Sequence, residues 1–140
     1  MKIVIDTNVA LDVLLERTGF LQASHSVLKL SAQGRVNGFL TTNTITDMYY
    51  VLHKNSKDAT KSKQAIAQLI KLVTLEVITP DDISLALTSN ITDFEDAVLC
   101  FAAKRINADC IVTRNTSDFA KSPVPAMTPA EFISRFFVDA

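Results

Sequence analysis

The stretch DCIVTRNTSDF, residues 109–119, places a short apolar run directly before a cluster of polar side chains. Its first part, CIVT, is rich in β-branched residues and is typical of a buried strand. The second part holds a basic residue, an amide, hydroxyls and a carboxylate within seven positions. Short polar side chains such as Asn115 and Asp118 also close tight turns, so the local pattern leaves two interpretations open, a turn and a functional site.

Three further runs are similar to this strand, and each leads into a longer stretch with helical periodicity. They are KIVI (2–5), VNGFLT (36–41) and LEVI (75–78). Strands that alternate with helices are typical of a parallel sheet whose faces are covered by helices. The sequence therefore predicts an α/β fold in which CIVT (110–113) is a fourth strand.

Apolar residues recur at helical spacing in two segments, which predicts helices with one buried face. These stripes are Ile45, Met48, Tyr49 and Leu52 in the first segment, and Ile66, Leu69, Ile70 and Val73 in the second. Helix starts are marked by Asp93, three residues before Asp96, and by Thr128 followed by Pro129. Residues 53–63, HKNSKDATKSK, are polar and predict an exposed loop between two helices.

Length and composition restrict the class of protein. A chain of 140 residues, 48% of them hydrophobic, predicts one domain over residues 1–140. The chain has 14 basic and 15 acidic residues, so bulk charge does not hold it on nucleic acid and any phosphate binding has to be local. Cys100 and Cys110 lack C-x-x-C spacing and predict buried, reduced thiols. No apolar run approaches the ~18 residues that cross a bilayer, so we expect a cytoplasmic protein without membrane contact.

Four carboxylates fall where ligands bind in parallel sheets, beyond the carboxyl ends of the strands. Asp6 ends the first strand, Asp118 follows the fourth, and Asp47 and Asp96 lie early in predicted helices. Each alone has a structural explanation. Asp6 and Asp96 favour a helix N-terminus through its dipole, Asp47 is explained as a solvated side chain, and Asp118 is explained as part of a turn.

Together the four carboxylates predict a cation. Two like charges about 6 Å apart repel by about 3 kcal/mol at an effective dielectric constant of 20. Six such pairs would rival the roughly 5 to 15 kcal/mol that holds a domain folded. If the carboxylates converge, protons or a divalent ion must relieve the repulsion, and oxygen ligands without His or Cys select Mg²⁺ or Mn²⁺ over zinc.

Four segments together resemble the PIN domain family over nearly the whole chain. They are IVIDTNVALDVLLER (3–17), TTNTITDMYYVL (41–52), ITDFEDAVLCFAAKRINADCIVTRNTSDF (91–119) and TPAEFI (128–133). PIN domains are Mg²⁺- or Mn²⁺-dependent nucleases, and many are the toxins of bacterial toxin–antitoxin pairs. The resemblance implies a three-layer α/β/α sandwich with a parallel sheet of four to five strands. It also implies an endoribonuclease with an RNA substrate, a divalent metal cofactor and a possible antitoxin partner.

The resemblance also implies which residues form the site. The catalytic and metal-binding carboxylates are Asp6, Asp47, Asp96 and Asp118, and the supporting residues are Thr7, Asn8, Asp93, Thr113 and Asn115. Asp47 departs from the family, which more often has Glu at this position, so its shorter arm is expected to reach a metal through water. Thr113 and Asn115 are expected to hold carboxylates by hydrogen bonds. Arg114 is interpreted as solvated, with phosphate contact as the alternative.

Two other function classes stay open. One is an RNA- or partner-binding module with little turnover, which only Asp47 in place of Glu favours. The other is a phosphatase or phospho-acceptor domain, but DTN (6–8) lacks the D-x-D pair of haloacid-dehalogenase-like phosphatases.

Several charged and aromatic residues outside the site are interpreted as surface features. Asp12 and Glu16 are interpreted as surface charges. The lysine cluster is interpreted as a solvated face, with RNA contact as the alternative, and consists of Lys54, Lys57, Lys61 and Lys63. Tyr50 and Val51 lie off the apolar stripe of their helix, so we expect a homodimer.

Overall fold

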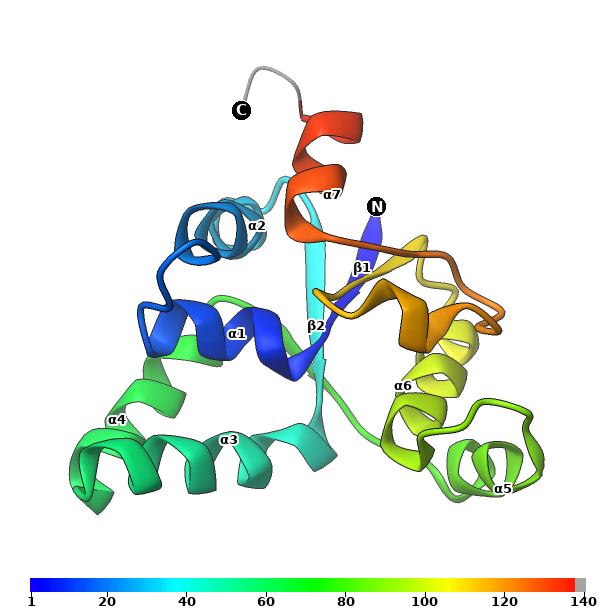
Figure 1. The fold of residues 1–140 in the computed structure, drawn as a ribbon, viewed down its shortest axis with the longest axis horizontal. Coiled ribbons are helices and arrows are strands. Elements are labelled where there is room, and N and C mark those ends of the chain that lie inside the picture. Colours follow the sequence, from blue (N-terminus) through cyan, green and yellow to red (C-terminus); the bar gives the residue numbers. More distant parts are fainter. Residues whose placement is uncertain (138–140) are drawn as a thin grey trace.

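The computed structural model describes residues 1–137, which contain a five-stranded parallel sheet (Figure 1). Its order is β3-β2-β1-β4-β5. The strands are β1 (Lys2–Ile5), β2 (Asn37–Thr41), β3 (Thr74–Glu76), β4 (Cys110–Val112) and β5 (Ala126–Met127). The helices are α1 (Thr7–Leu14), α2 (Leu21–Ala32), α3 (Thr42–Ser56), α4 (Ala59–Leu69), α5 (Pro80–Thr88), α6 (Phe94–Arg105), the 3₁₀ helix η1 (Thr116–Phe119) and α7 (Pro129–Phe136). The predicted α/β fold with a parallel sheet is confirmed.

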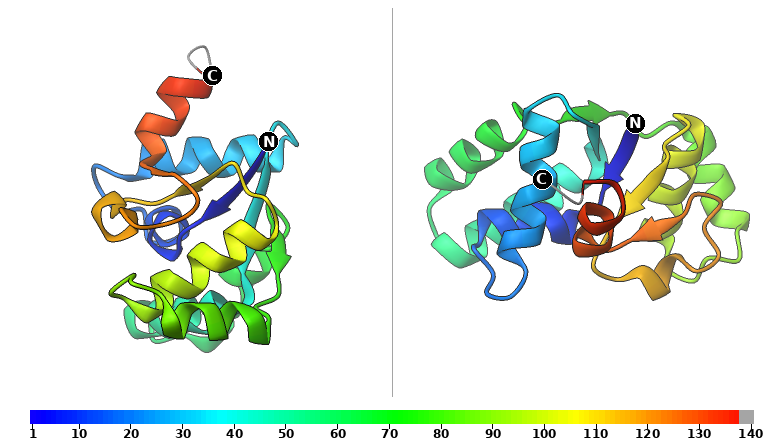
Figure 2. Two further views of the ribbon diagram at one scale, coloured as in Figure 1. Left: turned by 90° about the vertical axis from the view of Figure 1, so that its right-hand side faces the viewer. Right: turned by 90° about the horizontal axis from the view of Figure 1, so that it is seen from above.

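Side chains alternate across the sheet and divide the core into two parts. Figure 2 shows the helices that lie on the two faces of the sheet. Ile3 and Ile5 of β1 face a core built with α1, α2, α3, α4 and α7. Val4 of β1 and Ile111 of β4 face the opposite core, which is built with α5, α6 and η1. This separation follows from the two-residue period of a strand and produces the expected three-layer sandwich.

The order of the strands determines where the candidate site lies. The chain runs outward from β1 to β2 and β3 on one side, and then continues as β4 and β5 on the other side. The ends of β1 and β4 therefore lie side by side where the winding reverses, with Ile5 paired to Val112. In open α/β sheets this reversal leaves a crevice beyond the strand ends.

The predicted strands are confirmed, with differences at the edges of the sheet. The third strand begins at Thr74 and ends at Glu76, one residue earlier at its start than predicted and two at its end. The fifth strand is only Ala126–Met127, too short to show an apolar pattern in the sequence. It is defined by hydrogen bonds to β4, including the one from Ile111 N to Pro125 O.

The predicted loop over residues 53–63 is wrong. Helix α3 continues to Ser56 and α4 begins at Ala59, so a two-residue turn connects them. Lys57 adopts the left-handed conformation that ends α3, and the side chain of Asp58 accepts a hydrogen bond from Lys61 N at the start of α4. The lysines of this segment are therefore mostly helical and remain exposed. Polarity indicated exposure correctly, but it does not exclude a helix.

The predicted helical stripe of α3 is confirmed, while that of α4 is confirmed only in part. Met48 and Leu52 are buried in the core, and so is Leu69 of α4. Helix α4 ends at Leu69, so Ile70 caps it and remains 38% exposed. Both predicted helix starts are correct, because Asp93 caps α6 and Thr128 forms a capping box with Glu131 at α7.

Cys100 and Cys110 are free and buried, as predicted. Burial raises the pKa of Cys100 to about 11 and that of Cys110 to about 12, so both thiols are protonated and unreactive at neutral pH. None of the helices within residues 1–137 combines the length and the apolar character that crossing a membrane requires.

Candidate functional site

Asp6 stands at the centre of the site, between the end of β1 and the start of α1. It is the N-cap of α1, and its Oδ1 accepts a hydrogen bond from Thr7 N at 2.8 Å. Its Oδ2 accepts one from Thr113 Oγ1 at 2.8 Å, across the junction with β4. Burial raises the pKa of Asp6, the hydrogen bonds from Thr113 and Thr7 oppose that shift, and the charge of Asp118 adds to it. The carboxylate is therefore fixed in position but lacks enough compensating charge.

A layer of polar residues holds Asp6 in place. Thr113 is fully buried, and its Oγ1 also accepts a hydrogen bond from Asn115 N at 3.1 Å. Asn8 Nδ2 lies 3.4 Å from Asp6 Oδ2, and Asn8 Oδ1 accepts from Arg114 N at the same distance. These bonds tie the segment after β4 to the start of α1.

Asp96 enters the site from the first turn of α6. The N-cap Asp93 accepts a hydrogen bond from Asp96 N through its Oδ1 at 2.9 Å. The pKa of Asp96 is raised to about 7, mainly by burial and then by the neighbouring charges of Asp93, Asp6 and Asp118, in that order. Carboxylates from three distant segments thus share one electrostatic environment.

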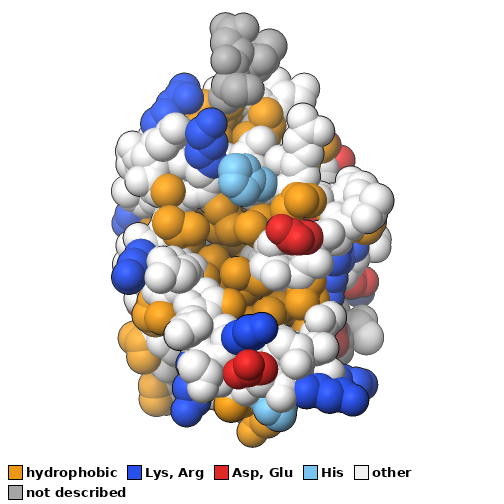
Figure 3. Space-filling model, turned by 90° about the vertical axis from the view of Figure 1, so that its left-hand side faces the viewer, with side chains coloured by type: hydrophobic (Ala, Val, Ile, Leu, Met, Phe, Trp, Pro, Cys, Tyr) orange, Lys and Arg blue, Asp and Glu red, His pale blue; other side chains and the backbone are white. Residues whose placement is uncertain are grey.

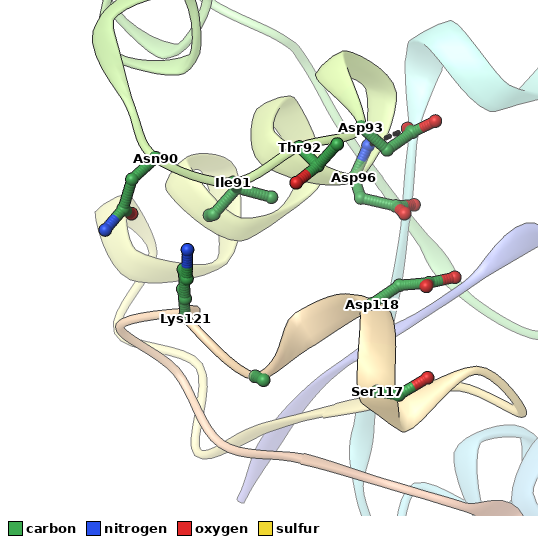
Figure 4. A pocket seen from close by; sticks show the side chains of 9 residues that line it. Asn90, Ile91, Thr92, Asp93, Asp96, Ser117, Asp118 and Lys121 are labelled. Atoms are coloured by element: carbon green, nitrogen blue, oxygen red, sulfur yellow. Dashed lines mark hydrogen bonds between the residues drawn. The ribbon is translucent and has the colours of Figure 1, made fainter.

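Asp118 faces Asp96 across a pocket of about 390 Å³ (Figure 4). Asp118 belongs to η1 and is exposed, and its backbone N–H donates to Asn115 O at 3.0 Å. The pocket is lined by Asn90, Ile91, Thr92, Asp93, Asp96, Ser117, Asp118, Ala120 and Lys121. The turn and the site are therefore not alternatives, because the turn of η1 brings Asp118 to the site.

The structure places Asp47 outside this pocket. Asp47 lies exposed on the second turn of α3, close enough to Glu95 of α6 to raise the pKa of that carboxyl. The pKa of Glu95 is raised to about 7, mainly by burial and then by its interaction with Asp47. The Glu95 carboxyl is therefore partly protonated near neutral pH.

Sequence reasoning missed Glu95. Its signal was present in the segment DFED, residues 93–96, which has three carboxylates in four positions where a helix N-cap needs only one. Local pattern could not show that Glu95 meets Asp47, because the two residues belong to different helices.

The chemistry of this donor set fits a hard divalent cation. The side chains around the pocket offer carboxylate, hydroxyl and amide oxygens, and like charges add to burial in raising the pKa of Asp96. Among residues 1–137, however, no three carboxylates, histidines or cysteines lie close enough together to hold one ion. Shared binding of an ion therefore requires the carboxylates to move closer to one another.

The interpretations of Asp12 and Arg114 as solvated surface residues are wrong. The side chain of Asp12 is fully buried, and its Oδ2 lies 2.8 Å from Arg114 Nε. The N–H does not point along this line, so the contact is an ion pair rather than an aligned hydrogen bond. Ser24 and Arg17 add contacts to Asp12 at 3.1 and 3.4 Å, and the Arg114 guanidinium stacks on Phe20 with its carbon 4.0 Å from the ring centroid. Arg114 thus anchors the segment after β4 to α1.

Replacing Arg114 with methionine is expected to lower the free energy of unfolding by about 2 to 3 kcal/mol, because Asp12 stays buried with a weaker partner. The matched variant Arg17→Met should cost about 1 kcal/mol or less, because Arg17 is one-third exposed and its contact is longer. Urea unfolding of the two variants measures this difference. Equal stability of Arg114→Met and the wild-type chain would contradict the role of the ion pair.

Comparison with known proteins gives a family and a fold. The family model described as PIN domain matches residues 2–117. A structure of VapBC2 from Rickettsia felis, bound to a DNA fragment from its promoter, aligns with a TM-score of 0.70 and 14% identity, covering 91% of this chain and 98% of that one. DNA-bound VapBC from Salmonella typhimurium aligns with a TM-score of 0.71 and 12% identity, covering 92% of this chain and 98% of that one. A toxin–antitoxin complex from Klebsiella pneumoniae aligns with a TM-score of 0.66 and 21% identity, covering 90% of this chain and 96% of that one. No curated protein matches the chain significantly in sequence.

Proposed function

The chain belongs to the PIN domain family, and from this premise we propose that it is an endoribonuclease that hydrolyses phosphodiester bonds in RNA with Mg²⁺ or Mn²⁺. We further propose that it is the toxin of a toxin–antitoxin pair. The assignment to RNA rests on the family resemblance, and the metal dependence rests on the oxygen donors of the site.

One observation carries this proposal. Asp6, Asp96 and Asp118 come from segments far apart in the chain, yet they meet where the sheet reverses its winding: the charges of Asp6 and Asp118 raise the pKa of Asp96, and the charge of Asp118 raises the pKa of Asp6. Such clustering is unfavourable for folding, so it is typical of a site selected for binding or catalysis. A surface without function would separate these charges.

The residues have different roles in this proposal. Asp6, Asp96 and Asp118 would hold the metal, which when bound would activate water and stabilise charge on the phosphate oxygens. Thr113 and the backbone of Thr7 fix the Asp6 carboxylate, and Asn8 and Asn115 fix Thr113 and its segment. Asp93 orients the first turn of α6. Asp47 and Glu95 lie outside the pocket, and Glu95 retains or releases a proton near pH 7.

The products of cleavage test the mechanism. If water attacks the phosphorus, the products carry a 5′-phosphate and a 3′-hydroxyl, because the 2′-hydroxyl is not the nucleophile. We expect cleavage of labelled single-stranded and hairpin RNAs to stop with chelator, to return with Mn²⁺ or Mg²⁺, and not to return with zinc. Cyclic phosphate ends or cleavage without metal would contradict the mechanism.

A binding module with little turnover is the second candidate. Two observations favour it: Asp47 stands outside the pocket, and no three ligands within residues 1–137 are arranged to share an ion. Replacing Asp47 with glutamate, the residue more frequent in the family, should retain or increase cleavage by a nuclease. Tight RNA binding without cleavage in any metal would favour the module.

An antitoxin partner is supported by an apolar surface on the side of α1, α2, α3 and α4. Figure 3 shows hydrophobic side chains gathered and partly hollowed in the middle of this face. Val13, Leu14 and Leu15 of the α1 region and Ala65 and Ile66 of α4 are only partly buried in the core beneath it. We propose that a partner protein covers this face. Co-expression with the product of the neighbouring reading frame and co-purification would test the pairing.

A homodimer is proposed from α3, whose Tyr50 and Val51 point away from the core and are 70% and 37% exposed. Light scattering at tens of micromolar protein should give about twice the chain mass. A mass near 15.4 kDa would contradict the dimer.

A further inference from the structure

The pocket beside the carboxylates has two chemically different ends (Figure 4). Asp93, Asp96 and Asp118 form one end, and Asn90 and Lys121 form the other. The acidic end belongs to the site described above. The basic end is not needed to hold those carboxylates.

Lys121 is the cation at this end, and its side chain forms no ion pair with the described residues 1–137. It follows η1 by two residues, and in Figure 4 its amine points toward the segment of Asn90 and Ile91 across the pocket. Within residues 1–137, Lys121 forms no ion pair, although three carboxylates line the same pocket. A lysine that served to neutralise these carboxylates would contact one of them.

The neighbouring polar groups are also uncommitted. The side chains of Asn90, Thr92 and Ser117 line the pocket and form no hydrogen bond to the described part of the chain. An amide, two hydroxyls and an ammonium group thus line one space of about 390 Å³, which lies within the usual range for small-molecule sites.

We propose that this basic end is a subsite for the phosphate next to the scissile one, with Lys121 as its cation and Asn90 as a hydrogen-bonding neighbour. The proposal rests on the proposed nuclease function and names a part of its substrate site. A single strand crossing the pocket places one phosphodiester at the acidic end, and the adjoining phosphate then lies at the end that carries positive charge. The chain carries a net charge of −1, so local cations of this kind are needed to hold RNA.

The test compares Lys121→Met with Lys121→Arg and with Lys104→Met. Lys104 is an exposed lysine in the last turn of α6, at the opposite end of the helix from Asp96, and serves as the matched control. Lys121→Met should raise KM for single-stranded RNA about 5- to 10-fold with kcat within about twofold, because a phosphate contact away from the reacting atoms supplies uniform binding. Lys121→Arg should retain most of the affinity, and Lys104→Met should not change it.

Two further measurements separate a phosphate contact from a structural effect. The slope of log(kcat/KM) against log salt should become shallower by about 0.7 in Lys121→Met alone. A methylphosphonate replacing one phosphate next to the scissile bond, scanned on both sides, should weaken wild-type binding about as much as Lys121→Met does, and should have no further effect on that variant. Equal KM and salt slope in Lys121→Met and Lys104→Met would overturn the proposal. The same methylphosphonate penalty in the wild type and Lys121→Met would overturn it as well.

A binding assay keeps this inference distinguishable from the nuclease function. Fluorescence anisotropy of a labelled RNA in chelator measures affinity and its salt dependence without turnover. If the wild-type chain cleaves no RNA, weaker binding and a shallower salt slope in Lys121→Met would still support the subsite. Wild-type binding that is absent, or unchanged in Lys121→Met, would overturn it.

Discussion

Replacing Asp96 with alanine is expected to lower the rate of RNA cleavage about 100-fold or more. Removing one ligand of a catalytic metal costs several kcal/mol of transition-state stabilisation, and each 1.36 kcal/mol is a factor of ten in rate. Asp6→Ala should have a similar effect, because Thr113 and Thr7 hold its carboxylate at the junction of β1 and β4. Single-turnover cleavage of one labelled RNA by each purified variant measures these rates.

The double variant distinguishes a shared centre from two independent sites. Asp6→Ala combined with Asp96→Ala should cost little beyond the worse single change, because ligands of one centre act as a unit. Asp81→Ala is the matched control, since Asp81 is an exposed acidic residue in the first turn of α5 and does not line the pocket. Multiplied losses in the double variant, or full activity of Asp96→Ala, would contradict the assignment of the site.

Mn²⁺ or Mg²⁺ is expected to raise the melting temperature of the protein at pH 7.5. An ion at 100 times its dissociation constant adds about 2.7 kcal/mol when it binds only the folded state. Asp6 and Asp96, whose pKa values are raised partly by neighbouring carboxylates, are the groups whose repulsion such an ion relieves. Asp96→Asn should remove most of the response. Identical melting of this variant and the wild-type chain, with and without metal, would show that the ion binds elsewhere or not at all.

The pH dependence without metal provides an independent control. The pKa of Asp96 is raised from 3.8 to about 7 in the folded state, so the folded chain binds an extra proton between these values. Stability from this group is therefore complete below about pH 4 and is lost as the pH rises through about 7. Melting in chelator should be higher at pH 5 than at pH 7.5, and the difference should be smaller in Asp96→Asn. No difference between the two proteins would contradict the crowding of charge at Asp96.

The sequence by itself determined the features that depend on neighbouring residues. The strands KIVI and CIVT, the caps at Asp93 and Thr128 and the stripe of α3 are local patterns of hydrophobicity and hydrogen bonding, and the structure has them where they were expected. The expected positions of Asp6 and Asp118 followed from the predicted strands, because a parallel sheet brings the ends of its strands to one edge. The resemblance to PIN domains, confirmed by the family match, depended on these same segments.

Tertiary structure decided the features that join residues far apart in the chain. Asp12 has an ordinary helical position, and only packing shows that it is buried beside Arg114, 102 positions later. The sequence indicates only that Glu95 belongs to the start of a helix, whereas the fold places Asp47 of α3 near it. In the same way, Lys121 gains its proposed role from the pocket wall that faces it. The reason is physical: burial and nearby charge set the protonation and the partners of an ionisable side chain, and both depend on which segments the fold places together.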